Sequence, residues 1–186
     1  MNIGFAMCGS FCTYTEVFPV LEALASIHTV TPIFSLASQT TDSRFGTAEE
    51  HIQRAEAICG RKAMLSIADV EPLGPTQLLD VLVIAPCTGN TLAKLAHSIA
   101  DGPVTMAAKS HLRNGRPVLI AVSTNDALAG AAENIGKLLN KKNYYFVPFG
   151  QDDPIKKPTS MVADFKKLPQ ALEFALDGKQ IQPILI

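Results

Sequence analysis

The chain has 186 residues, of which 47% are hydrophobic, and its formal net charge is −1. This length fits one domain of ordinary size, with enough apolar residues to build a core. The near-neutral charge argues against a nucleic-acid-binding protein, which would present a basic face, and gives no reason to expect a membrane surface as partner.

The N-terminus and the cysteines predict a cytoplasmic protein without disulfides. No apolar run reaches the roughly 18 residues that a membrane-spanning helix needs, and residues 1–4 lack the positive flank of a signal peptide. The 4 cysteines form no Cys-x-x-Cys pair. We therefore expect free thiols and no metal site.

Short apolar segments alternate with segments of helical periodicity along the chain. In chain order, the pattern predicts a strand at 3–7, a helix from about 15–18 to 24, a strand at 29–36, a helix at 47–59, a strand at 80–85, helices at 90–99 and 103–113, a strand at 117–122, a helix at 127–139, a strand at 144–148 and a helix at 169–176. Strands separated by helices favour an α/β fold with a parallel central sheet and helices on both faces.

Several helix ends carry specific signals. Thr47 and Glu50 form a capping-box pattern, Gly60 is a typical helix stop, and Pro103 suits the first position of a helix. The polar segment 150–160 is followed by too little chain to form a second domain. We therefore expect a single domain over residues 1–186, with 150–160 as a lid or interface loop.

Three expected strand ends carry small polar residues. They are residues 8–10, 35–41 and 86–91. Ligands of open parallel sheets bind at the carboxyl ends of the strands, and hydroxyls, glycines and free N–H groups at helix starts suit an anion. The loop 86–91 is the richest, because Thr88, Asn90 and Thr91 offer polar groups and Gly89 allows close approach. An ordinary strand–turn–helix connection with a Thr or Asn cap is the alternative.

Other motifs narrow the ligand class. Neither a G-x-G-x-x-G fingerprint nor a phosphate-binding G-x-x-x-x-G-K-[ST] loop is present, so a mononucleotide fits better than a dinucleotide. The four histidines are expected to be structural, and Cys87 to be a buried, unreactive thiol. Arg44, Lys156 and Lys157 are candidates to meet an acidic substrate, with solvated surface charges as the alternative.

The segment DVLVIAPCTGNTLAKLA, from Asp80, resembles the strand and P-A-S-A-N-T loop of the flavin-dependent cysteine decarboxylase superfamily. This resemblance covers most of residues 1–150. Further segments resemble the B-subunit family of dipicolinate synthase from spore-forming bacteria. They are CGSFCT from Cys8, TDSRFG from Thr41, IAPCTGNT from Ile84, STND from Ser123 and VPFGQDDP from Val147.

The resemblance implies a Rossmann-like three-layer flavoprotein fold, FMN as cofactor and assembly into a homo-oligomer. It also implies a partner, the A subunit of dipicolinate synthase, that carries an NAD(P) site. Together the two proteins would convert 4-hydroxy-tetrahydrodipicolinate, or the dihydrodipicolinate formed from it, into dipicolinate by dehydration and two-electron oxidation. The implied compartment is the cytoplasm of the mother cell during sporulation.

Site residues follow from the same resemblance. The expected FMN-binding residues are Gly9, Ser10, Ser38, Pro86, Cys87, Thr88, Asn90, Thr91 and Ser123. The resemblance does not supply the cationic residues: from the residues themselves we expect Arg44 and Lys156 or Lys157 to bind the carboxylates of the substrate, with Asn90 and Lys156 as the catalytic candidates.

Two departures from the superfamily pattern keep alternatives open. The decarboxylases use a catalytic histidine on a helix after the second strand, whereas the sequence around His51 does not match theirs. The superfamily Ala before the loop Asn is Gly89 here, and its Ala-Ser pair is Cys87 and Thr88. The alternative functions are a flavin-dependent decarboxylase of a cysteinyl substrate and a non-catalytic partner module of the A subunit.

Overall fold

The computed structural model describes residues 1–186 as a mixed sheet between two layers of helices. The strands are β1 (Asn2–Met7), β2 (Thr29–Phe34), β3 (Val81–Cys87), β4 (Val118–Thr124), β5 (Tyr144–Phe146), β6 (Phe149–Gln151) and β7 (Met161–Ala163). Their order is β2-β1-β3-β4-β7-β6, with β5 paired to β4. The strands β1 to β5 are parallel, and β6 and β7 form an antiparallel extension.

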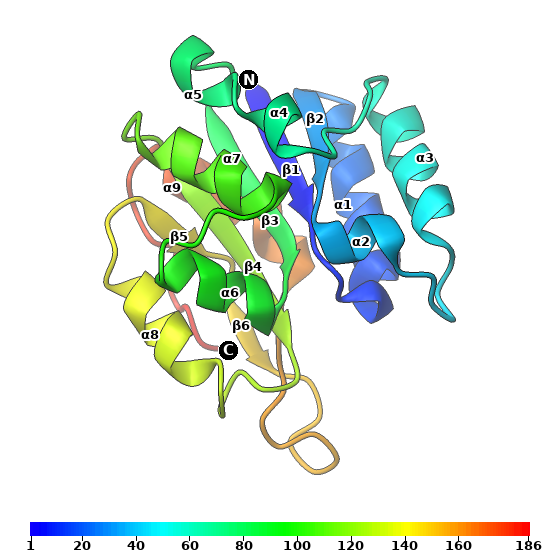
Figure 1. Ribbon diagram of the computed structural model, residues 1–186. Coiled ribbons are helices and arrows are strands. Elements are labelled where there is room, and N and C mark those ends of the chain that lie inside the picture. Colours follow the sequence, from blue (N-terminus) through cyan, green and yellow to red (C-terminus); the bar gives the residue numbers. More distant parts are fainter.

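Helices cover both faces of the sheet. The helices are α1 (Tyr14–Ala25), α2 (Leu36–Thr40), α3 (Ala48–Cys59), α4 (Ile67–Val70), α5 (Leu73–Thr76), α6 (Gly89–Ala96), α7 (Pro103–Leu112), α8 (Ala132–Leu139) and α9 (Leu168–Leu176), with short 3₁₀ turns η1 (Phe11–Thr13) and η2 (Phe165–Lys167). Helices α1 and α9 pack on one face, and α6 and α7 on the other, with α8 beside α6 (Figure 1). The expected three-layer α/β fold is confirmed. No helix is both long and apolar enough to cross a membrane.

The apolar runs explain why β3 and β4 lie in the centre. Every residue of β3 is buried, and β4 is buried except at its last residue. Strands covered on both faces by helices read as continuous apolar segments, which is the pattern of parallel sheets. The predicted strand positions at 3–7, 80–85 and 117–122 therefore match β1, β3 and β4.

The helix-end signals act as the sequence indicates. The Thr47 hydroxyl accepts a hydrogen bond from Glu50 N, and the Glu50 carboxylate accepts one from Thr47 N, which completes the capping box. Gly60 ends α3 with a φ of +61°, a conformation that favours glycine. Pro103 is the first residue of α7.

Several expected elements differ from the structure. The helix expected at 90–99 ends at Ala96, the strand expected at 144–148 ends at Phe146, and α2, α4, α5, β6 and β7 were not expected. The second strand ends at Phe34 rather than at 36, because the Ser35 hydroxyl accepts a hydrogen bond from Ser38 N and begins helix α2. Residues 125–131 form turns in place of the expected helix start. There the Leu128 N–H donates to the carbonyl of Thr159, 3.0 Å away, and so joins these turns to the loop before β7.

Buried His111 makes the stability of the fold depend on pH. It lies on α7, and its Nε2 donates to the carbonyl of Pro117 at 3.0 Å. Burial lowers the pKa of His111 from 6.5 to about 4. Because the unfolded chain binds this proton more readily, the stabilising effect is present above pH 6.5 and is lost as the pH falls toward 4.

We therefore expect the free energy of unfolding to fall by about 2 kcal/mol from this group between pH 7 and pH 5. His111→Gln keeps a donor for Pro117 but does not titrate, so its urea-unfolding curves should depend less on pH. His97→Gln, at an exposed position, is the control. Equal pH dependence in wild type and His111→Gln would contradict the assignment.

Candidate functional site

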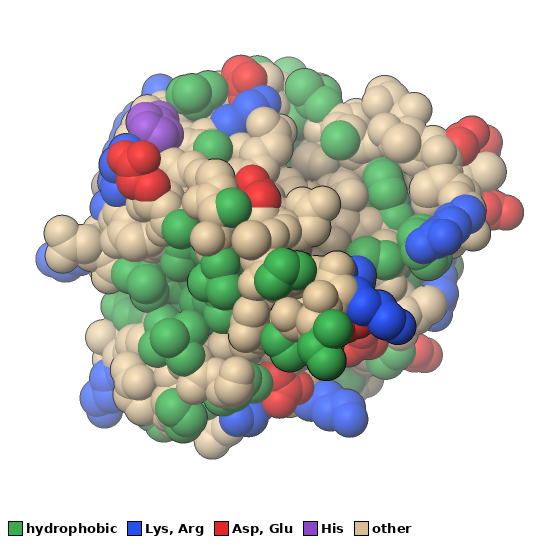
Figure 2. All heavy atoms as spheres, turned by 90° about the horizontal axis from the view of Figure 1, so that it is seen from below, with side chains coloured by type: hydrophobic (Ala, Val, Ile, Leu, Met, Phe, Trp, Pro, Cys, Tyr) green, Lys and Arg blue, Asp and Glu red, His purple; other side chains and the backbone are tan.

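Two cavities lie at the carboxyl ends of the parallel strands, where ligands of open α/β sheets bind. The first cavity, of about 280 Å³, is lined by Gly9, residues 35–37, Thr88, Asn90, Thr91, Lys94 and residues 101–105. The second cavity, of about 760 Å³, is lined by residues 9–12, 43–45, 88–90 and 123–126, and by Asp152, Lys157, Ser160 and Val162. Gly9, Thr88 and Asn90 line both, so two bound molecules would meet there. Figure 2 shows this end of the molecule, where Lys or Arg and Asp or Glu side chains lie close together.

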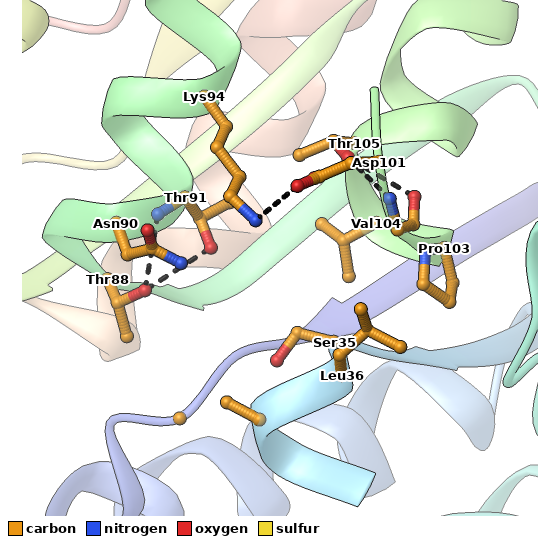
Figure 3. A pocket seen from close by; sticks show the side chains of 13 residues that line it. Ser35, Leu36, Thr88, Asn90, Thr91, Lys94, Asp101, Pro103, Val104 and Thr105 are labelled. Atoms are coloured by element: carbon orange, nitrogen blue, oxygen red, sulfur yellow. Dashed lines mark hydrogen bonds and ion pairs between the residues drawn. The ribbon is translucent and has the colours of Figure 1, made fainter. Parts of the chain in front are cut away.

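Three helices begin at the first cavity. Ser35 caps α2, Thr88 caps α6, and Gly102 precedes α7. Figure 3 shows Ser35, Thr88 and Pro103 around one space. The first N–H groups of a helix have no acceptor within it, and the helix dipole adds partial positive charge, so this arrangement suits an anion such as a phosphate.

The lysine at the first cavity is already neutralised. Lys94 Nζ lies 2.9 Å from the Asp101 carboxylate, and this ion pair joins α6 to the segment before α7 (Figure 3). The hydrogen bond from Lys94 lowers the pKa of Asp101. An anion in the first cavity would therefore be held mainly by backbone N–H groups and hydroxyls.

Two expected site residues of the loop 86–91 lie beneath the cavities. The Pro86 carbonyl accepts from Cys8 N at 3.2 Å, and Cys87 is fully buried. Burial raises the pKa of the Cys87 thiol well above its usual value, so this thiol stays neutral. Thr91 lines the first cavity and donates to Cys8 Sγ at 3.3 Å. Pro86 and Cys87 therefore fix the loop, while its polar side chains face the cavities.

Ser38 lines neither cavity. Its buried hydroxyl donates to the carbonyl of Met7 at 3.1 Å and lies 2.9 Å from the Ser35 hydroxyl. Ser35, three residues earlier, lines the first cavity instead. Both serines lie in the pattern Ser-x-x-Ser after a strand, so a helix cap at Ser35 was the available signal.

The loop after β1 contacts the end of β4 at the second cavity. Ser10 and Ser123 both line it, and their hydroxyl oxygens lie 2.7 Å apart. This hydrogen bond links strands that are separated by β3 in the sheet. Gly9, Ser10 and Ser123 therefore lie at the place that the sequence indicated.

Two of the three cationic candidates lie at a cavity in the structure. Arg44 and Lys157 line the second cavity, whereas Lys156 is exposed and lines neither cavity. Lys157 Nζ lies 3.0 Å from the Asp152 carboxylate, which raises the pKa of Lys157. Arg44 forms no ion pair, and its guanidinium lies 4.8 Å from the centre of the Phe45 ring.

Sequence reasoning missed an acidic side chain in the second cavity. Asp126 Oδ1 accepts a hydrogen bond from the Thr124 hydroxyl at 2.5 Å. A Cβ atom on Gly89 would lie 2.7 Å from that oxygen and 2.9 Å from Thr124 Oγ1. The Thr124–Asp126 pair therefore occupies the space that the superfamily Ala would need, and a Cβ atom at position 89 would force these side chains to shift.

His51 lines neither cavity, although its ring stacks on that of Phe11, a lining residue of the second cavity, with 6.3 Å between the ring centres. It is buried on α3 among aromatic rings, with its ring centre 4.7 Å from that of Tyr14 and 6.0 Å from that of Phe18. Its Nε2 has no hydrogen-bond partner, and burial lowers its pKa. This environment keeps His51 neutral as part of the packing between α1 and α3.

Comparisons of sequence and structure with known proteins identify the family of this chain. The sequence model of the family described as Flavoprotein matches residues 1–168. The chain belongs to the flavoprotein family. Over all 186 of its residues it is 49% identical to the dipicolinate synthase B subunit of Bacillus subtilis (strain 168), 93% of which is covered. The resemblance to dipicolinate synthase B subunits that the sequence motifs indicated is confirmed.

Solved structures show the same fold. The crystal structure of the dipicolinate synthase B subunit from Bacillus halodurans C has a TM-score of 0.90 and 47% identity, and the match covers 100% of this chain and 95% of that one. The FMN-dependent cysteine decarboxylase SpaF has a TM-score of 0.69 and 24% identity, with 95% of each chain covered. The likeness to SpaF is one of fold.

The packing around Gly89 gives a test of the site. We expect Gly89→Ala to destabilise this flavoprotein by about 1–3 kcal/mol, because the new methyl group would overlap Asp126 and Thr124. Gly136→Ala is the matched control: it lies within α8 with no atom within 4 Å of its Cβ position, and alanine is the better helix former by up to about 1 kcal/mol. Urea unfolding measures both. A stable Gly89→Ala variant would show that the loop packs differently.

Proposed function

We propose that this flavoprotein is the FMN-binding component of a two-component dipicolinate synthase. The observation that carries the proposal is the wall shared by the two cavities, where Gly9, Thr88 and Asn90 would bring a cofactor and a small ligand into contact. The full-length similarity to dipicolinate synthase B subunits supports the choice of reaction.

The residues around the first cavity fit a phosphate-bearing flavin. Three helix N-termini supply N–H donors, Ser35 and Thr88 supply hydroxyls, and the Lys94–Asp101 pair adds no net charge. Asn90 and Thr88 lie between the two cavities and would orient the cofactor toward the ligand. FMN, when bound, supplies a two-electron acceptor for a hydride.

The second cavity would hold the cyclic dicarboxylate. Arg44 and Lys157 would bind its carboxylates, and Asn90 offers both a donor and an acceptor to the ring. The proposed reaction removes water, two electrons and two protons from 4-hydroxy-tetrahydrodipicolinate, or two electrons and two protons from dihydrodipicolinate, to give the aromatic dipicolinate. The A subunit would supply the NAD(P) site, and the pair would act in the cytoplasm of the mother cell during sporulation.

Apolar side chains at the cavity rims support assembly of several copies. Leu36 at the first cavity is 52% exposed and Phe45 at the second is 40% exposed. Each of these side chains would lose exposed apolar area if another copy covered the cavity rim. We propose that the flavin sites lie near the contacts of a homo-oligomer.

Ser35 tests the cofactor site. We expect Ser35→Ala to weaken FMN binding about tenfold, because it removes both a hydroxyl at the cavity and the cap that orders the start of α2. Quenching of flavin fluorescence during titration measures the affinity. Thr40→Ala, on the same short helix but outside both cavities, is the control. A wild-type chain that takes up no FMN, yet activates the A subunit, would favour the non-catalytic module instead.

Lys157 and Asn90 test the substrate site in the reconstituted pair of proteins. We expect Lys157→Ala to raise the KM for dipicolinate formation about tenfold, because it leaves Asp152 unpaired against the substrate carboxylates. Asn90→Ala should lower the rate as well. Lys156→Ala is the control, since this side chain lies outside both cavities. Equal KM values for the two lysine variants would count against the proposed site. Release of CO₂ from a cysteinyl peptide would instead favour the alternative function, a flavin-dependent decarboxylase.

A further inference from the structure

The Asp126 carboxylate is held in a fixed place at the second cavity. Its Oδ1 accepts from the Thr124 hydroxyl at 2.5 Å. Its two oxygens face two glycines, because Cβ atoms on Gly89 and Gly130 would lie 2.7 Å from Oδ1 and 3.4 Å from Oδ2. The Asp126 carbonyl also accepts from the N–H of Ala131 at 3.0 Å. Side chain and backbone therefore both restrict this residue.

Charge pairing in the second cavity leaves two groups uncompensated. Asp152 and Lys157 neutralise each other at 3.0 Å. Asp126 forms no ion pair with Lys, Arg or His, and Arg44 forms none with an acidic group. A ligand that carries both a carboxylate and a hydrogen-bond donor would satisfy both remaining charges.

The chemistry of a carboxylate decides which ligands it favours. An ionised carboxylate only accepts hydrogen bonds, so it attracts N–H and O–H groups. It repels a carboxylate that comes near, and the repulsion is strongest where water is partly excluded. Under the proposed function, on which this inference rests, the reactant 4-hydroxy-tetrahydrodipicolinate has a ring hydroxyl, whereas the aromatic product has the same two carboxylates and no N–H or O–H at neutral pH.

We propose that Asp126 is a specificity-determining residue that favours ligands with a ring N–H or O–H donor over the flat aromatic dicarboxylate. Arg44 binds a carboxylate of either ligand, and Asp126 discriminates between them. The discrimination would hold the reactant and promote release of the product. The pairing of Asp126 with Gly89 also explains why this chain departs from the superfamily Ala at that position.

Two stable compounds test the preference on the FMN-loaded chain by isothermal titration calorimetry. Piperidine-2,6-dicarboxylate carries a protonated ring amine, and pyridine-2,6-dicarboxylate carries the same two carboxylates without a donor. We expect wild type to bind the piperidine compound about five- to tenfold more tightly. Asp126→Asn keeps the shape and an acceptor for Thr124, and we expect it to bind the pyridine compound more tightly than wild type does and to lose the preference.

Control variants separate this role from a general effect of charge or folding. Glu133→Gln removes one negative charge from exposed α8, where Glu133 pairs with Lys137, and should leave the preference unchanged. Arg44→Gln should weaken both compounds alike. If Asp126→Asn does not fold, Asp126→Ser offers a smaller neutral side chain with the same expected loss of preference.

The outcomes distinguish the inference from the proposed function. An unchanged ratio of affinities in the folded Asp126 variants, with both compounds bound, would overturn the role of Asp126 and leave the proposed substrate class in place. Failure of wild type to bind either compound would overturn the substrate class and, with it, this inference.

Discussion

The pairing of β3 with two neighbours determines where the candidate site lies. β3 is hydrogen-bonded to β1 on one side and to β4 on the other, and all its residues are buried. A ligand can therefore reach the carboxyl end of β3 only at the edge of the sheet, between the loops that follow β1 and β4. The Thr88–Thr91 turn lies there and separates the two cavities. The Ser10–Ser123 hydrogen bond closes the floor beneath this turn.

Local pairing of charges shapes what each cavity can bind. Lys94 with Asp101 and Lys157 with Asp152 are neutral pairs. The first cavity thus attracts anions mainly through helix N-termini, whose effect depends on direction and close approach. The second cavity keeps Arg44 and Asp126 as separate opposite charges. Two neighbouring spaces of different electrostatic character are suited to a phosphate-bearing cofactor and a polar small molecule.

The change from Ala to Gly at position 89 is linked to a change on another strand. Thr124 is the last residue of β4, and Asp126 lies two residues further along the chain. Both fill the space beside Gly89, because a Cβ atom there would lie 2.7 Å from Asp126 Oδ1 and 2.9 Å from Thr124 Oγ1. Because these polar groups fill the space, position 89 on α6 carries glycine, which is a poor helix former. The helix tolerates it because Gly89 is its first residue, where the helix is capped by Thr88.

Sequence by itself determined the five parallel strands β1 to β5, the starts of α3 and α7, and the family, because apolar runs, capping residues and the loop motif are local patterns. It gave no sign of the short antiparallel strands β6 and β7. It also placed Gly9, Ser10, Thr88, Asn90 and Ser123 at one sheet edge, since parallel strands share that edge. Tertiary structure alone placed Ser35 but not Ser38 at the first cavity, Lys157 but not Lys156 at the second, and Asp126 against Gly89. These choices depend on which way a side chain faces and on contacts between residues far apart in the chain, and such contacts leave no periodic pattern in the sequence.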